Sequence, residues 1–238
     1  MSTSARRSPH AALFAAVVGP STVFAFLAVE VRIHGVLPLD REILGRLRPH
    51  YDDEPAHSIA AALLTIGGEG YPELPFLLVG GVVVAFAATR RYGSTLFLAA
   101  AAAGPLIAVP LLKPVFPRPL LHAGAAGASY FPSGHAAGSI AVVAALVLLV
   151  GSSRRRRYPA AAGAVLVAAY GFSLFFLRSH YPTDVLAGWC LGVAWVATLR
   201  LLSARWVPAP GARAHAPSAW LPSGWLRRAS DRCSRGGT

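Results

Sequence analysis

The chain has 238 residues, of which 55% are hydrophobic and 13% are charged. This balance is too apolar for a soluble domain of that length and predicts a membrane protein. The formal net charge of +12 does not indicate nucleic-acid binding, because the arginines stand in short runs between apolar segments and in the C-terminal tail.

Six apolar stretches, in chain order, predict an all-α polytopic membrane protein with six transmembrane helices. A helix needs about 20 apolar residues to cross the hydrocarbon core, and each stretch comes close to that length. The first stretch could instead be a cleaved signal peptide, because two arginines precede it, but no convincing cleavage site follows. The stretches cover residues 11–29, 71–89, 94–112, 133–151, 158–177 and 184–199.

Three parts follow from this division of the chain. Residues 1–10 form a predicted cytoplasmic N-terminus, and residues 11–203 form the six-helix transmembrane domain. Residues 204–238 form a basic tail that is rich in Pro, Ala, Gly, Ser and Arg. This tail has too few large apolar residues for a core, so we expect it to be disordered and cytoplasmic.

The arginine runs predict the orientation in the plasma membrane. If all six stretches span, the runs at 6–7, 90–91 and 154–157 and the tail fall on one side, which should be the cytoplasm. The extracytoplasmic side then collects the segment 32–70, the loop 113–132 and the turn 178–183. Within the first of these, residues 39–47 mix charged and apolar residues in a helix-like way, and residues 57–66 are apolar but too short to span. An interfacial or re-entrant piece fits both.

Lys113 and Arg118 are the first candidate functional residues on that side. Lys113 is the only lysine of the chain and stands at the outer end of the third stretch. Two cations there can bind an anionic group. The alternative is that both are interfacial anchors, the commoner role for a cation at a helix end.

The second candidate group is Ser133, Gly134 and His135, which lead directly into the fourth stretch. Ser133 can cap this helix, and the free backbone N–H groups of a helix start bind anions. The alternative is an ordinary capped helix with an incidental histidine.

The third group is Arg178, His180 and Asp184. His180 and Asp184 are four positions apart and can face each other across the first turn of the last helix. A carboxylate that accepts from one imidazole nitrogen fixes the tautomer and leaves the other nitrogen as a nucleophile. The alternative is that Asp184 only caps the helix.

All three groups fall on the same, extracytoplasmic side of the predicted topology. Together they supply cations, helix N-terminal amides, two histidines and an orienting carboxylate. This combination favours phosphoryl transfer without a metal, and no metal-ligand spacing is visible in the sequence. We therefore expect no cofactor.

At this point the sequence resembles the type 2 phosphatidic acid phosphatase family, which is related to bacterial acid phosphatases and vanadium haloperoxidases. The family signature runs Lys-x6-Arg-Pro, Pro-Ser-Gly-His and Ser-Arg-x5-His-x3-Asp. Residues 132–135 match the second part in full, and the histidine and aspartate of the third part match in spacing. Leu120 and Leu174 occupy the two family arginine positions. Arg118 stands two residues before the first, and Arg178 stands four residues after the second, which a continuing helix would place on the same face.

The resemblance implies roles for these residues. His180 would attack phosphorus, Asp184 would orient it, and His135 would protonate the leaving group and later activate water. The phosphate oxygens would be held by Lys113, Arg118, Ser133, Gly134 and Arg178.

The resemblance also implies a substrate class, a lipid phosphate or lipid pyrophosphate whose tail stays in the bilayer. Undecaprenyl pyrophosphate, phosphatidic acid and phosphatidylglycerol phosphate are candidates that the sequence does not separate. A lipid phosphotransferase and a non-catalytic lipid-phosphate-binding protein are the alternatives. A haloperoxidase is disfavoured because spanning helices bracket the site.

Overall fold

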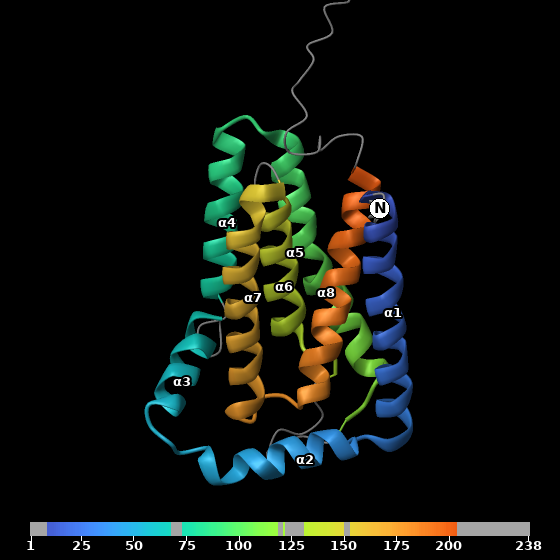
Figure 1. Ribbon diagram of the computed structural model, residues 1–238, viewed down its shortest axis with the longest axis vertical. Coiled ribbons are helices and arrows are strands. Elements are labelled where there is room, and N and C mark those ends of the chain that lie inside the picture. Colours follow the sequence, from blue (N-terminus) through green and yellow to red (C-terminus); the bar gives the residue numbers. More distant parts are fainter. Residues whose placement is uncertain (1–8, 68–72, 119–120, 122–130, 150–152, 204–238) are drawn as a thin grey trace, which may run out of the picture.

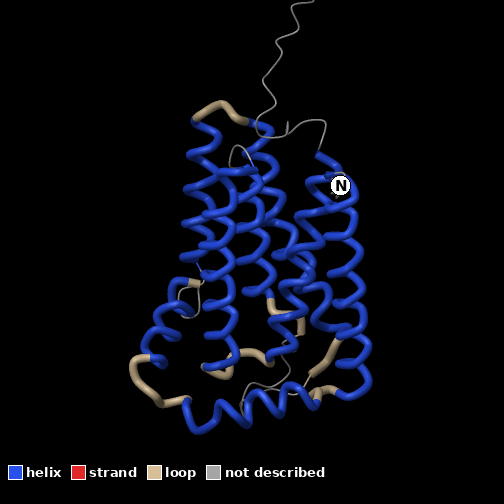
Figure 2. The backbone as a smooth tube through the Cα atoms, in the orientation of Figure 1, coloured by secondary structure: helices blue, strands red, loops and turns tan. Residues whose placement is uncertain are grey.

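The computed structural model describes residues 9–67, 73–118, 121, 131–149 and 153–203. Within these residues the chain is helical with turns and loops and contains no strand, as Figure 2 shows. The predicted all-α fold is therefore confirmed for the described part. The predictions for the first eight residues and for the tail after residue 203 lie outside it.

Six long helices form an upright bundle (Figure 1), and each corresponds to one of the predicted apolar stretches. Successive members of the bundle run in opposite directions, with α2 and α3 placed between the first and the second of them. The six are α1 (Pro9–His34), α4 (Glu73–Ala88), α5 (Tyr92–Leu112), α6 (Gly134–Leu149), α7 (Ser153–Phe176) and α8 (Pro182–Leu202).

Four of these helices, α1, α5, α7 and α8, are long and apolar enough to cross a membrane. The helices α4 and α6 have 16 residues each. At 1.5 Å per residue, each is about 24 Å long, which is short of the roughly 30 Å hydrocarbon core. The described structure thus supplies four clear candidate spans where the sequence predicted six.

Large apolar side chains cover the outside of the bundle. Phe14 and Phe26 on α1 are 65% and 61% exposed, and Leu111 and Val165 are each 70% exposed. Such surfaces are unfavourable in water and suit hydrocarbon, and helices satisfy most of their backbone hydrogen bonds internally, as a membrane span requires. The protein is a multi-pass membrane protein.

The helices α6 and α8 pack so closely that their backbone atoms are in contact. A Cβ atom placed on Gly188 of α8 would lie 2.5 Å from the carbonyl oxygen of Ser133, and one on Gly192 would lie 2.5 Å from that of Ala137. Small residues at such crossings let membrane helices pack closely. This contact fixes the start of α6 against the first turns of α8.

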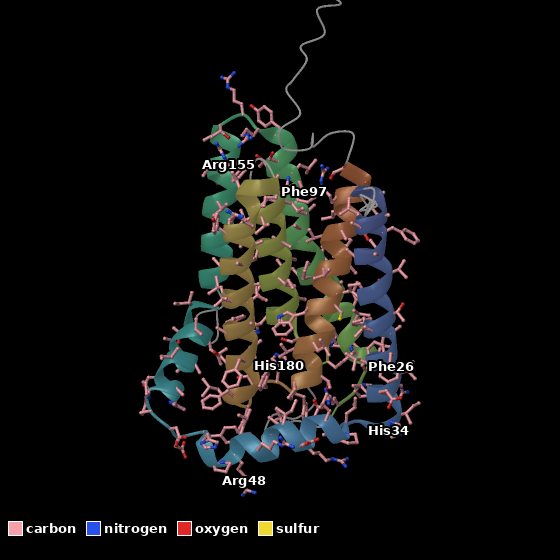
Figure 3. The ribbon with its side chains drawn as sticks, viewed as in Figure 1. Phe26, His34, Arg48, Phe97, Arg155 and His180 are labelled. Carbon is pink, nitrogen blue, oxygen red and sulfur yellow. The ribbon has the colours of Figure 1, made fainter. Side chains whose placement is uncertain are left out.

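One end of the bundle is crossed by α2 (Pro38–Leu47), followed by the short helix η1 (Arg48–His50) and by α3 (Ala56–Ile66). Both non-spanning helices expected from the sequence are therefore present. Figure 1 shows α2 lying across the end of the bundle at a large angle to the other helices. The two basic segments at the α4–α5 turn and at the start of α7 lie at the opposite end, where Figure 3 labels Arg155.

Candidate active site

The start of α6 is tied to the start of α8. The Oγ of the buried Ser133 accepts a hydrogen bond from the Ala136 N–H at 3.3 Å, which confirms Ser133 as the cap of α6. The Ser133 N–H in turn donates to the carbonyl oxygen of Asp184 at 3.1 Å. Two segments that lie about 50 residues apart in sequence thereby meet at one point.

Asp184 combines the two roles that the sequence left as alternatives. Its Oδ2 accepts a hydrogen bond from the Tyr181 N–H at 2.9 Å, so that it caps α8. The same oxygen lies 3.6 Å from Nδ1 of His180. The predicted approach of His180 and Asp184 is confirmed, and the carboxylate both begins the helix and faces the imidazole.

The two histidines of the site face each other. The ring centroids of His135 and His180 are 6.4 Å apart, so that one small group of atoms can contact both rings. His180 is buried, whereas His135 is exposed. Figure 3 places His180 inside the bundle near the end crossed by α2. The site is therefore open on the side of His135.

Arg118 lies inside the protein between two carboxylates. Its fully buried guanidinium donates to Asp184 and to Asp40, and its Nη1 donates to the hydroxyl of Thr183 at 3.0 Å. The guanidinium carbon lies 4.0 Å from the ring centroid of Tyr181. Its Nε has no hydrogen-bond partner in the part of the chain that is described. One donor of Arg118 thus remains beside the site.

Asp40 is a residue that the sequence analysis missed. Its buried carboxylate accepts hydrogen bonds from the N–H and the hydroxyl of Thr183, at 3.0 and 2.9 Å, and from the Leu37 N–H at 3.2 Å. A signal was present, because residues 37–40 and 181–184 share the pattern x-Pro-x-Asp. Proline at the first helical position and an acid two residues later mark a helix start in both places.

Arg178 lies elsewhere than expected. The helix α7 ends at Phe176, and Arg178 follows it in the left-handed conformation with φ of 62°. The Ser179 N–H donates to the Leu174 carbonyl at 2.9 Å, a bond typical of a terminated helix. Leu174 itself is fully buried in the core. The prediction that Arg178 continues the helix face of Leu174 is therefore wrong.

The side chain of Arg178 points instead to a pocket beneath the bundle. Its guanidinium carbon lies 5.6 Å from the ring centroid of Tyr51, whose hydroxyl donates to the Leu44 carbonyl at 3.1 Å. Burial raises the pKa of the Tyr51 hydroxyl, and the nearby cations Arg178 and Arg48 oppose that shift. The pocket has a volume of about 440 Å³ and is lined by Leu44, Gly45, Arg48, Tyr51, Leu121 and Arg178.

Lys113 and Gly134 are the two remaining residues that the sequence predicted to bind phosphate. Lys113 begins the short helix η2 (Lys113–Val115) and is half-buried, and its ammonium forms no hydrogen bond or ion pair with a described residue. Gly134 is the first residue of α6, where its N–H belongs to the free amides of the helix start. Both residues can donate to an anion.

The site thus unites two histidines, two buried carboxylates and a buried arginine from four segments of the chain. Comparisons with known proteins identify the family. A model of the PAP2 superfamily matches residues 21–208, which is most of the chain. This protein belongs to the PAP2 superfamily. The family expected from the sequence motifs is confirmed.

A solved structure shares the fold of this PAP2 protein. The crystal structure of the first transmembrane PAP2 type phosphatidylglycerolphosphate phosphatase from Bacillus subtilis matches with a TM-score of 0.62 and 18% sequence identity. The match covers 80% of this chain and 97% of the other. No curated protein sequence matches significantly.

Proposed function

We propose that this protein removes phosphate from a lipid phosphate or lipid pyrophosphate through a phosphohistidine formed at His180. The observation that carries the proposal is the pairing of His180 with the Asp184 carboxylate, opposite the exposed ring of His135. Membership of the PAP2 superfamily and the fold shared with a phosphatidylglycerolphosphate phosphatase support a substrate of this class.

In the first step, the Nε2 atom of His180 attacks phosphorus while the bond from phosphorus to the leaving oxygen breaks. Asp184 faces Nδ1, so that this nitrogen keeps its proton and the ring is held in one orientation. His135 gives a proton to the leaving oxygen, which departs as the lipid alcohol or the lipid monophosphate.

In the second step, His135 accepts a proton from water, and the water oxygen attacks the phosphorus of the phosphohistidine. The P–N bond breaks, orthophosphate leaves, and His180 returns to its neutral form. Apart from the lipid phosphate and water, both steps use side chains of this protein.

Donors from several segments hold the phosphate oxygens in this proposal. Negative charge is spread over three equatorial oxygens during phosphoryl transfer and requires several fixed donors. The proposed donors are Lys113, Arg118 through its Nε, the Ser133 hydroxyl, the Gly134 N–H, and Arg178 from the rim.

The site faces the extracytoplasmic side, with six membrane crossings and both chain ends in the cytoplasm. This orientation is supported by the basic segments at the end of the bundle opposite to His180. A site at bilayer level lets the lipid tail remain in the membrane while the headgroup enters.

Phosphate release by the purified protein tests the proposal. The protein in detergent and EDTA is offered lipid monophosphates and lipid pyrophosphates, beside His180→Ala and the control His34→Ala, which alters an exposed histidine at the same end of the bundle. We expect the native protein and His34→Ala to release phosphate and His180→Ala to release none above background.

Two other outcomes are decisive. Phosphate transfer to an added alcohol without release of orthophosphate would identify a phosphotransferase. Lipid binding that is equal in the native protein and in His180→Ala, with no turnover in either, would identify a binding protein and refute the proposal.

A further inference from the structure

We propose that Asp40 of α2 is a positioning residue for the His180–Asp184 pair and acts on it through Arg118 and Thr183. This inference rests on the proposed function and adds to it a residue outside the three signature motifs. Asp40 lies on a helix that does not belong to the upright bundle, and 143 positions separate it from Thr183.

The geometry of Asp40 goes beyond the capping of α2. One hydrogen bond, from the Leu37 N–H, caps its own helix, and the other partners, Thr183 and Arg118, belong to the site. Thr183 immediately precedes Asp184, so Asp40 holds the first turn of α8 by its backbone and its side chain. A surface cap would not be fully buried or need these partners.

The charge of the cluster gives Asp40 its role. Arg118 lies between Asp40 and Asp184, and these three groups have a formal net charge of −1. Attack by Nε2 leaves a positive charge on the His180 ring, with Nδ1 directed at Asp184. Without the second carboxylate, Arg118 would neutralise Asp184, and the positive ring would lose its stabilisation in the low-dielectric interior.

Arg118 also depends on Asp40 for its position. A guanidinium buried among apolar groups requires partners for its donors, and two of its nitrogens are used by the carboxylates. These two contacts fix the plane of the guanidinium, and the direction of its remaining donor, the Nε–H, is thereby fixed as well. The position of α2 therefore determines both the position of the nucleophile His180 and that of the Arg118 Nε, one of the proposed phosphate donors.

The test compares Asp40→Asn with the matched control Glu42→Gln. Both changes remove one negative charge from α2, but Glu42 is exposed, and Arg46 on the same helix is its one ion-pair partner among the described residues. Asparagine keeps the shape and one acceptor oxygen at position 40. We expect Asp40→Asn to lower kcat by about 10- to 100-fold, the size of the loss when the hydrogen-bond partner behind a metal-ligating residue is removed. KM should stay within about threefold, because the charge on His180 develops only in the transition state.

A second pair of variants covers the case in which Asp40→Asn does not fold. Thr183→Val removes the hydroxyl that links Asp40 to Arg118 at nearly constant volume, and Thr183→Ser restores it. We expect kcat to fall in the valine variant and to recover in the serine variant, while thermal unfolding in detergent checks that both variants are folded.

The outcomes separate this inference from the proposed function. If the native protein releases no phosphate, the proposed function fails and this inference falls with it. If the native protein is active and Asp40→Asn keeps its kcat, or falls no further than Glu42→Gln, the role of Asp40 is refuted. Equal kcat in Thr183→Val and Thr183→Ser would also refute it.

Discussion

Arg178 occupies a backbone conformation that suits glycine better than arginine. Its φ of 62° ends α7, and a residue with a Cβ atom is strained in this region by about 1 kcal/mol. The left-handed position after a helix is usually glycine. The side chain that replaces it here reaches over Tyr51 at the rim of the cationic pocket. We infer that position 178 holds an arginine because of its guanidinium, since the turn itself would favour glycine.

Replacement by glycine should separate the two effects. Arg178→Gly relaxes the backbone and removes the cation, so we expect the free energy of unfolding to rise by up to about 1 kcal/mol. At the same time kcat/KM for a lipid phosphate should fall by about tenfold, the loss of one charge-assisted hydrogen bond. Thermal unfolding in detergent and phosphate release measure the two quantities.

Arg90 provides the matched control for this prediction. It has φ of 56° after α4, at the end of the bundle opposite to the site. Arg90→Gly should give the same gain in stability with unchanged kcat/KM. Equal activity in the two glycine variants would show that Arg178 contributes nothing to turnover.

At the residue scale, the sequence analysis found the contacts that are local and missed those that are not. Ser133 as a cap and the approach of His180 to Asp184 depend on neighbours within four positions. The contact of Arg118 with Asp40 joins residues 78 positions apart, and no periodicity or spacing encodes it. The buried pair of Arg118 and Asp40 can be recognised only from the three-dimensional arrangement of the helices.

At the scale of the element, the contact of α8 with α6 brings the two histidines together. His135 stands on the first turn of α6, and His180 precedes α8 by two residues. Gly188 lies at this contact, because a Cβ there would meet the Ser133 carbonyl oxygen at 2.5 Å and the Ala136 Cβ at 2.9 Å. The backbone oxygen of Ser133 cannot move aside for an added Cβ atom as the end of a flexible side chain could.

Gly188→Ala should therefore push the helices apart. We expect a loss of about 1–3 kcal/mol in stability, as overpacking costs in other cores. We also expect a lower kcat, because the two histidines move away from each other. Thermal unfolding and phosphate release in detergent check both effects.

Gly138→Ala is the control on α6. A Cβ on Gly138 would meet nothing within 4 Å, so alanine should be neutral or should stabilise the helix by up to about 1 kcal/mol. A wild-type kcat in Gly188→Ala would contradict the idea that this crossing sets the geometry of the site.

The sequence predicted the presence of the helices more accurately than the residues at which they begin and end. All six apolar stretches are helical, and so are the two shorter pieces between the first and the second. Hydrophobicity does not report where a helix stops, however. The prediction for Arg178 failed because α7 ends two residues earlier, and the start of α8 two residues after His180 requires the chain to turn sharply there.

At the scale of the whole molecule, the arrangement of the ends predicts the topology. Two exposed positions at opposite ends of the bundle, Asp53 and Arg91, are suited to cysteine labelling after Cys190 and Cys233 are replaced. In intact cells, an impermeant maleimide should label Asp53→Cys, whereas Arg91→Cys should react only after permeabilisation. The opposite pattern would place the site in the cytoplasm.

The position of Asp40 limits how this protein can be recombined with its relatives. The segment from α2 to α3 looks like an exchangeable surface module, because it lies across the end of the bundle. Its buried carboxylate nevertheless completes a charge cluster whose other members come from two distant segments. A chimera whose imported segment lacks an acid at position 40 would bury Arg118 against Asp184 without its second counter-charge. Exchange should succeed only when residue 40, Arg118 and the first turn of α8 are transferred as one unit.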